Sequence, residues 1–237
     1  MKLAILVYGE YRQFDISVKS WKFLDDFDCD VYVSTWDKSV QINKNLDINL
    51  VQDITEEKIR NLIPDAKILI LNEERDYPLK NNDYERDRNS RRLLFHWYKL
   101  NEMMKQSNVQ YDGVFLIRND LYVTNYQKCV LDRNDLEDRI IGLNHIQITG
   151  NNEYFLPDVY FYGTQKNISN MIDLLDYENP PNIHTYIARV VLELGLYVEK
   201  ETQFSCEVLR PNCIGMENFI HKDIVTKLQH WDNTVNM

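Results

Sequence analysis

Short apolar blocks and longer stretches with helical spacing alternate along the first half of the chain. Runs of apolar residues at positions 3–8, 30–34, 67–71 and 114–117 are typical of strands buried on both faces of a parallel sheet. Apolar residues at helical spacing predict helices at about 14–24, 56–63 and 90–106, the second with Thr55 as its N-cap. This alternation predicts an α/β fold with a mostly parallel sheet covered by helices.

The second half of the chain is less regular. Two polar stretches also interrupt the first half: residues 38–50 are rich in asparagine and indicate an excursion, and residues 72–92 are highly charged and indicate a solvated loop. In the second half we expect strands at about 140–143, 158–162, 196–200 and 206–209, helices at 167–175 and 184–194, and an amphipathic segment over 224–231. No internal repeat or low-complexity linker divides the chain, so a single domain over residues 1–237 is expected.

Composition excludes several classes of function. No apolar stretch is long enough to span a membrane, and the N-terminal apolar run lacks a signal-peptide cleavage site, so we expect a cytoplasmic protein (host cytoplasm if viral) with at most peripheral membrane contact. The net charge is −10 and no basic cluster outweighs its acidic neighbours, which argues against nucleic-acid binding. The four cysteines lack paired metal-ligand spacing, which argues against a zinc site.

The most informative segment is the strand at 114–117 and the three residues after it. Four apolar residues run directly into Arg118, Asn119 and Asp120. Ligands of open α/β sheets bind beyond the carboxyl ends of the strands, so Asp120 is expected at the mouth of a site with Arg118 close by. A carboxylate there can hold a divalent cation, and an arginine can neutralise a phosphate. The pair therefore indicates a phosphorylated, metal-bound ligand.

Five motifs in order resemble a known family. Residues 3–14 and 30–37 are similar to that family's opening, "ALxxSGQxRTF…DVFIHTWD", and residues 111–123 are similar to its central "YDxVIRxRxDLxF". Weaker echoes lie at 95–100 and 158–163, and the match spans about residues 1–175. The chain thus resembles the glycosyltransferase-like proteins of viral, phage and bacterial surface-polysaccharide gene sets, within the nucleotide-diphospho-sugar transferase superfamily.

The resemblance implies a GT-A-like, Rossmann-like fold, with a nucleotide-sugar-binding half over residues 1–125 and an acceptor-binding half over 126–237. It implies transfer of a sugar from a nucleotide-diphosphate donor to a glycan or lipid-linked acceptor. GT-A enzymes hold Mn²⁺ or Mg²⁺ with an Asp-x-Asp motif, but here Arg118 occupies the first acidic position. Either Asp120 alone holds the metal, or Arg118 takes over part of the charge compensation and metal dependence is weak.

Several other positions are candidates for donor binding. Gly9 and Arg12 follow the first strand, where a GT-A fold contacts the nucleotide; Gly9 permits a tight turn, and Arg12 can clamp a phosphate. Asp37 ends the second strand and can bond a ribose or a base edge, with Trp36 as an apolar wall. Arg91 and Arg92 begin the predicted long helix, a poor place for cations unless they serve a ligand. An ordinary turn, cap or solvated surface role remains the alternative for each.

Chemistry on the acceptor requires a different residue. Inverting transfer uses a carboxylate to deprotonate the acceptor hydroxyl, and Asp158, just before a predicted strand, is the first candidate, with Glu153 as competitor. A retaining mechanism needs no such base. A late histidine sometimes joins the metal in GT-A enzymes, and His221 is the choice here, against an ordinary surface role.

Two other functions compete with glycosyl transfer. A nucleotidyltransferase would need a glycine-rich phosphate loop near the N-terminus, and Gly9 stands alone there. A catalytically degenerate GT-A module that binds nucleotide or glycan without turnover is the stronger alternative, because the first aspartate of the metal motif is missing.

Overall fold

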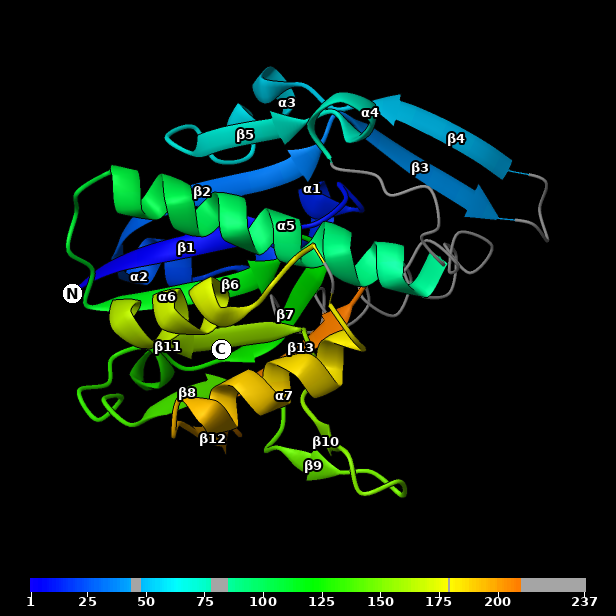
Figure 1. Cartoon of the computed structure of the whole chain (residues 1–237). Helices are drawn as coiled ribbons and strands as arrows, with labels where there is room; N and C mark the ends of the chain where they lie inside the picture. Colours follow the sequence, from blue (N-terminus) through cyan, green and yellow to red (C-terminus); the bar gives the residue numbers. More distant parts are fainter. Residues whose placement is uncertain (44–47, 78–84, 179, 210–237) are drawn as a thin grey trace.

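A seven-stranded sheet forms the centre of the protein (Figure 1). The computed structural model describes residues 1–43, 48–77, 85–178 and 180–209. The strand order is β12-β8-β11-β6-β1-β2-β5, so strands from both halves of the chain join one sheet. The strands are β1 (Lys2–Tyr8), β2 (Asp28–Trp36), β5 (Lys67–Leu71), β6 (Gly113–Arg118), β8 (Arg139–Gly142), β11 (Tyr160–Gly163) and β12 (Tyr197–Lys200).

One strand of this sheet runs against the others. β1 pairs in parallel with β2 and with β6, and β2 pairs in parallel with β5. β11 is antiparallel to both of its neighbours, β6 and β8, whereas β12 is parallel to β8. The start of β11 therefore lies at the same edge as the carboxyl ends of the parallel strands, with Tyr160 opposite Ile117 near the end of β6.

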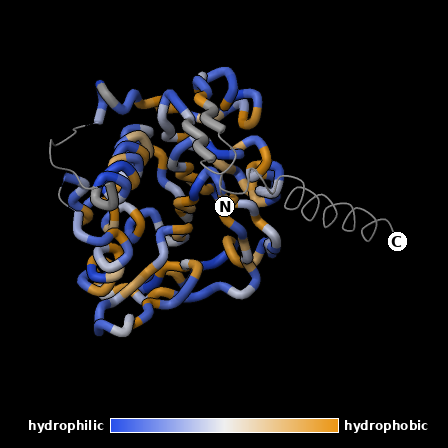
Figure 2. The backbone as a smooth tube through the Cα atoms, turned by 90° about the vertical axis from the view of Figure 1, so that its right-hand side faces the viewer, coloured by the Kyte–Doolittle hydropathy of each residue, from blue (hydrophilic) through white to orange (hydrophobic). Residues whose placement is uncertain are grey.

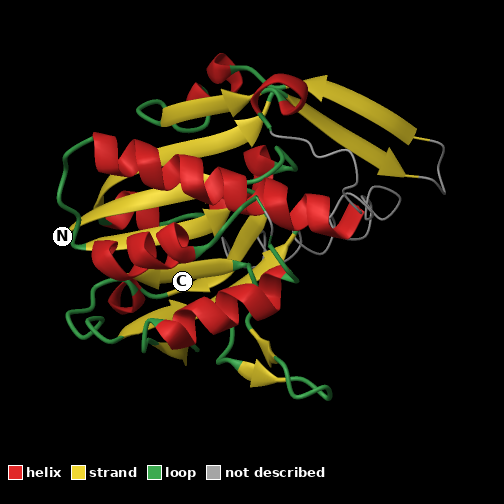
Figure 3. Cartoon of the chain, in the orientation of Figure 1, coloured by secondary structure: helices red, strands yellow, loops and turns green. Residues whose placement is uncertain are grey.

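Helices cover both faces of the sheet (Figures 1 and 3). The long helix α5 (Glu85–Gln106), α6 (Gln165–Leu174) and α7 (Ile183–Glu193) lie on one face. The other face is covered by short elements that follow β1, namely α1 (Phe14–Ser17), η1 (Val18–Ser20) and α2 (Phe23–Asp26). The remaining helical segments are α3 (Glu56–Arg60), α4 (Glu73–Asp76) and η2 (Lys128–Val130).

Alternation along β1 divides the core into two parts. Ala4, Leu6 and Tyr8 pack under α5 with Trp97 and Leu100, whereas residues 3, 5 and 7 pack on the other face against residues of the α1–α2 region. Because β1 lies at the centre of the sheet, both sets are fully buried, as the continuous apolar run predicts. Figure 2 shows apolar stretches along the strands in the interior and mixed polarity along the helices.

Small two-stranded sheets surround this core. β7 (Leu121–Tyr126) pairs with β13 (Phe204–Val208), β3 (Lys38–Asn43) with β4 (Ile48–Asp53), and β9 (Gln147–Ile148) with β10 (Tyr154–Phe155), all antiparallel. None of the helices in the described ranges is both long enough and apolar enough to cross a membrane.

The structure confirms the predicted mostly parallel α/β sheet and refines its elements. The asparagine-rich stretch at 38–50 is an excursion, but it carries the paired strands β3 and β4, in which Val40, Ile42, Ile48 and Leu50 alternate with polar residues. The expected helix at 14–24 is broken into α1, η1 and α2. α5 begins at Glu85 rather than near residue 90, because charged residues with high helix propensity extend it without adding apolar positions. The amphipathic segment expected at 224–231 lies outside the described residues.

Candidate functional site

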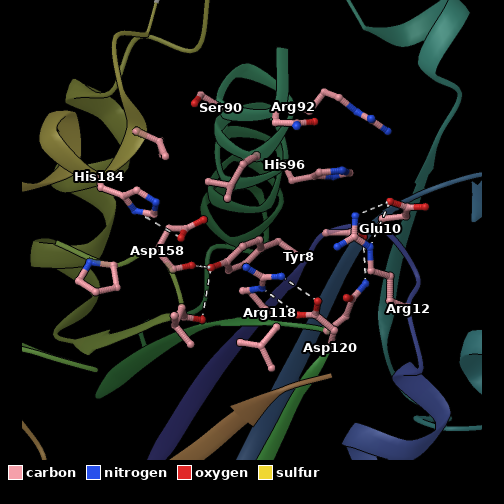
Figure 4. A pocket seen from close by; sticks show the side chains of 18 of the residues that line it. Tyr8, Glu10, Arg12, Ser90, Arg92, His96, Arg118, Asp120, Asp158 and His184 are labelled. Carbon is pink, nitrogen blue, oxygen red and sulfur yellow. Dashed lines mark hydrogen bonds and ion pairs between the residues drawn. The ribbon is translucent and has the colours of Figure 1, made fainter. Parts of the chain in front are cut away.

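A pocket of about 610 Å³ opens at the edge of the sheet where β1, β2 and β6 end and β11 begins (Figure 4). This is the edge at which the sequence predicted a site. Its walls come from the ends of those strands, from α5 and from the first turn of α7. Residues that line it and enter the argument below are Tyr8, Gly9, Glu10, Arg12, Trp36, Arg92, His96, Arg118, Asn119, Asp120, Asp158 and His184.

The turn after β1 forms part of the pocket wall. Gly9 has φ of +113°, a conformation that L side chains rarely adopt, as the predicted tight turn requires. Its N–H donates to the carbonyl of Ser34 at 3.3 Å. Asn119 donates from its backbone to the Tyr8 carbonyl at 3.0 Å and from Nδ2 to the Gly9 carbonyl at 2.9 Å. These bonds fasten the turns after β1 and β6 to each other.

Arg118 and Asp120 form a bidentate ion pair in the pocket. Arg118 Nε and Nη2 donate to the two Asp120 oxygens at 2.8 and 2.7 Å. The Asp120 side chain is 3% exposed and the Arg118 side chain 22%. Burial alone lowers the pKa of the Arg118 guanidinium, but the hydrogen bonds and charge of Asp120 outweigh it, so the pKa is raised and the group stays charged.

Two further arginines reach the pocket from other elements. Arg12 donates from Nε and Nη2 to Glu10 Oε2 at 3.2 and 2.9 Å. Arg92, on α5, lies 3.1 Å from Glu73 and places its guanidinium 5.0 Å from the centre of the Trp36 ring. Three guanidinium groups from three elements therefore line one pocket, each held by a carboxylate and each able to offer further N–H groups.

The described residues do not fit a divalent cation at Asp120. Both of its oxygens already accept hydrogen bonds from Arg118. Across residues 1–43, 48–77, 85–178 and 180–209, no three His, Cys, Asp or Glu side chains form a group that could hold a metal. His221, the predicted additional ligand, lies outside these ranges.

Asp158 and His184 lie across the pocket from Arg12 (Figure 4). Asp158 precedes β11, and its carbonyl accepts from the Tyr8 hydroxyl at 2.5 Å. Burial, and then the nearby Asp158 carboxylate, raise the pKa of Tyr8 well above its usual value, so the hydroxyl remains a donor. Asp158 Oδ1 lies 3.5 Å from Nδ1 of His184, in the first turn of α7.

His96 lies in the pocket wall as a neutral, buried imidazole. Its Nδ1 is 2.8 Å from the Ser34 hydroxyl, and its ring packs at 4.5 Å from the Trp36 ring. Burial, together with the charge of Arg92, lowers the pKa of His96 to about 3. The sequence analysis did not assign this residue a site role.

The structure separates the predicted site residues into two groups. Gly9, Arg12, Arg92, Arg118, Asp120 and Asp158 meet in the pocket, with Trp36 as the expected apolar wall. Asp37 is not among the lining residues, and its carboxylate accepts from Asn72 Nδ2 at 2.7 Å, linking the ends of β2 and β5. Arg91 is buried with its guanidinium 5.6 Å from the centre of the Tyr77 ring, away from the pocket lining. Glu153 is exposed near the β9–β10 turn and does not line the pocket.

Sequence reasoning missed Tyr8, Glu10 and His184. Tyr8 is the last residue of β1 and Glu10 follows Gly9, so their place at the end of a buried strand could have indicated them. His184 had no such signal, because it becomes a pocket residue only through its contact with Asp158, 26 positions earlier.

No protein-family model matches the chain, and no curated protein matches it. Among solved structures, it is similar to the galactosyltransferase LgtC in complex with donor and acceptor sugar analogs, at 13% identity over 84% of this chain and 73% of LgtC, with a TM-score of 0.48. It is also similar to the glycosyltransferase GlyE of Streptococcus pneumoniae TIGR4, at 17% identity and a TM-score of 0.45, covering 83% of this chain but only 44% of GlyE.

A third similar structure is described as a nucleotide-diphospho-sugar transferase of Desulfovibrio desulfuricans G20. It shares 13% identity over 84% of this chain and 79% of its own, with a TM-score of 0.39. These three similar structures are thus described as a galactosyltransferase, a glycosyltransferase and a nucleotide-diphospho-sugar transferase, and this chain covers each of them only in part.

Proposed function

We propose that this protein is a glycosyltransferase that moves a sugar from a nucleotide-diphosphate donor to a glycan or lipid-linked acceptor. The observation that carries the proposal is that three arginines, from three separate segments of the chain, line one pocket at the carboxyl ends of parallel strands. Such a set suits a diphosphate, whose oxygens accept paired N–H donors from arginine.

The donor diphosphate would lie against Arg118, Arg12 and Arg92. Breaking the bond between the anomeric carbon and the phosphate oxygen leaves negative charge on the diphosphate, and fixed guanidinium groups stabilise that charge. Because each guanidinium is already held by a carboxylate, little reorganisation is needed when the charge develops. Trp36 supplies an apolar wall for the base or the sugar.

Charge compensation by these arginines, rather than by a metal on Asp120, is part of the proposal. For Asp120 to hold Mn²⁺ or Mg²⁺, its carboxylate would have to leave Arg118 and uncover a buried charge. Asp120 is instead proposed to orient Arg118 toward the diphosphate. We therefore expect donor binding to be at most weakly dependent on a divalent cation.

The acceptor would enter from the side of Asp158 and His184. These residues belong to the second half of the chain, whereas Gly9, Arg12 and Arg118 belong to the first. We propose that residues 1–125 supply the donor-binding side and residues 126–237 the acceptor-binding side of one domain. Asp158 and His184 are the side chains proposed to serve removal of the proton from the attacking hydroxyl on this side.

A binding module without turnover is the second candidate. The observation in its favour is the engagement of both Asp120 oxygens by Arg118, at a position where GT-A enzymes use a free carboxylate. Binding and turnover therefore have to be measured separately.

The first test is thermal denaturation with UDP, GDP and CMP, each in EDTA and in Mn²⁺. We expect one nucleotide to raise the melting temperature in EDTA, and the rise to be lost in Arg118→Gln. Arg189→Gln, an exposed arginine on α7, is the matched control and should retain the shift. If no nucleotide shifts the transition, both glycosyl transfer and nucleotide binding are wrong; a shift without release of nucleoside diphosphate from a sugar donor favours the binding module.

A further inference from the structure

The imidazole of His184 is held between an aromatic ring and a carboxylate at the edge of the pocket. Its ring packs on Phe155 with 4.7 Å between centroids, and its backbone N–H donates to Asn182 Oδ1 at 3.1 Å, which caps the start of α7. The side chain is 31% exposed and lines the pocket. The imidazole therefore has a fixed position with one edge open to a ligand.

The two ring nitrogens of His184 have different surroundings. Nδ1 is buried and makes no hydrogen bond to the described residues. It lies 3.5 Å from Asp158 Oδ1. Nε2 makes no hydrogen bond to a protein group among the described residues, and it is not buried. Closing the 3.5 Å gap between Asp158 Oδ1 and Nδ1 while Nε2 stays open would give the arrangement by which a carboxylate orients an imidazole for proton transfer.

We infer that His184 Nε2 is the atom that accepts the proton of the attacking hydroxyl, and that Asp158 is a positioning residue which orients the ring. This inference rests on the proposed glycosyl transfer and names the residue that performs its proton step. The charged and titratable groups facing Asp158 are Tyr8, Arg118 and His184. The Asp158 carboxylate, 3.5 Å from Nδ1, is the group placed to orient the His184 ring.

The step balances as a single displacement. The acceptor oxygen forms a bond to the anomeric carbon while its O–H bond breaks and the proton moves to Nε2. The bond from the anomeric carbon to the phosphate oxygen breaks, and its electron pair leaves with the diphosphate facing the arginines. His184 then gives its proton to solvent. Attack from the side opposite the leaving group inverts the anomeric carbon, so a product with retained configuration would contradict the inference.

The first experiment reads the tautomer of His184 by ¹⁵N NMR of the ring nitrogens in the full chain, without any ligand. If Asp158 orients the ring, neutral His184 carries its proton on Nδ1, and Asp158→Ala shifts it toward the Nε2-protonated form that free histidine prefers. His145 is an internal reference, because its Nδ1 lies 2.9 Å from the Val198 carbonyl and should stay protonated in every variant. Exposed Asp65→Ala is the matched control. An Nε2-protonated His184 in the wild type, or an unchanged tautomer in Asp158→Ala, overturns the inference.

The second experiment measures release of nucleoside diphosphate from UDP-glucose, UDP-galactose and GDP-mannose. We expect His184→Gln to lower the rate on the best donor by at least about 100-fold while leaving the nucleotide-induced thermal shift intact. Turnover at the wild-type rate in His184→Gln overturns the inference alone. Absence of turnover in the wild type overturns the proposed glycosyl transfer and with it the catalytic role, while the tautomer measurement still decides whether Asp158 orients His184.

Discussion

Arg118 occupies the position at which the resembled family has an acid. The pocket therefore contains an ion pair between Arg118 and Asp120. Its guanidinium uses two N–H directions on Asp120 and keeps others for a ligand. The sequence showed that this position departs from the metal motif, but only the structure shows that the two residues bond each other. A strand residue and a turn residue two positions later meet here because the strand ends at Arg118.

Removing Arg118 should destabilise the protein through Asp120. Arg118→Met leaves a carboxylate that is only 3% exposed without its partner, and we expect the free energy of unfolding to fall by about 2–3 kcal/mol. Adding Asp120→Asn should restore part of that loss, because the buried charge is gone. Urea denaturation of the two single variants and the double variant gives the coupling energy. A single-variant loss under about 0.5 kcal/mol would show that the pair is not a buried ion pair in solution.

His96 should make the protein sensitive to acid. Its pKa is lowered from 6.5 to about 3 by burial, so the unfolded chain binds a proton below pH 6.5 that the folded protein does not. The stabilisation is complete above pH 6.5 and declines by about 1.4 kcal/mol per pH unit as the pH falls toward 3.

The measurement is the free energy of unfolding by urea at pH 7.0, 5.5 and 4.5 in wild type and in His96→Gln. We expect the free energy of unfolding of His96→Gln to fall less steeply with falling pH than that of the wild type. The two slopes should differ by about 1.4 kcal/mol per pH unit. The same measurement on His145→Gln, at an exposed histidine, is the matched control. Equal slopes in wild type and His96→Gln would mean that His96 titrates normally.

At the scale of elements, α7 ends at a glycine that the backbone requires. Gly195 has φ of +67° and donates its N–H to the Leu192 carbonyl at 2.9 Å, and nothing would contact an added Cβ within 4 Å. Gly195→Ala should therefore cost about 1 kcal/mol through backbone strain alone. Gly150 also has open space around a Cβ but no positive φ, so Gly150→Ala should be neutral or slightly stabilising. Thermal denaturation of both variants would separate the two; equal effects would contradict the backbone explanation.

The elements that could be predicted from the sequence are the strands that are buried on both faces, because such strands consist of consecutive apolar residues. β1 and β6 are buried on both faces, and their apolar runs placed them to within a residue or two. β3 and β4 were predicted only as an excursion, because the asparagine-rich composition of 38–50 was given more weight than the alternation of Val40, Ile42, Ile48 and Leu50 with polar residues. The first turns of α5 were missed for a related reason, since charged residues form a helix as readily as a loop.

The candidate site could be predicted only where it depends on strand ends. Gly9, Arg12, Arg118 and Asp120 follow buried strands, so the edge rule placed them correctly. Asp37 also ends a strand, yet its side chain bonds Asn72 instead of lining the pocket, and no local signal distinguishes it. The contact of His184 with Asp158 depends on how α7 packs against the start of β11, which the sequence alone does not give.

At the scale of the whole molecule, one sheet joins the two halves of the chain. β6, from the first half, pairs with β11, from the second, through Val114 to Ile117. Gly113 at the start of β6 also lies so close to Tyr162 that a Cβ would come within 2.5 Å of its hydroxyl. The first half of the chain thus covers the β6 edge of its part of the sheet only when the second half is present.

We therefore expect a fragment of residues 1–126 not to fold alone, because it would expose the β6 edge and the core face that Phe161 covers. The full chain should unfold in a single transition that coincides by tryptophan fluorescence and far-ultraviolet circular dichroism. Well-dispersed amide resonances from the fragment, or two separate transitions in the full chain, would show that the halves fold independently.

The reversed direction of β11 has a consequence for how this pocket could change over time. The proposed donor side is built by the ends of β1 and β6, whereas Asp158 belongs to the segment between β8 and β11, which also carries the β9–β10 turn. Insertions and replacements in that segment would remodel one side of the pocket and leave the arginines in place. Under the proposed function, changes in the segment that ends at Asp158 would alter the proposed acceptor side of the pocket and spare the proposed phosphate site.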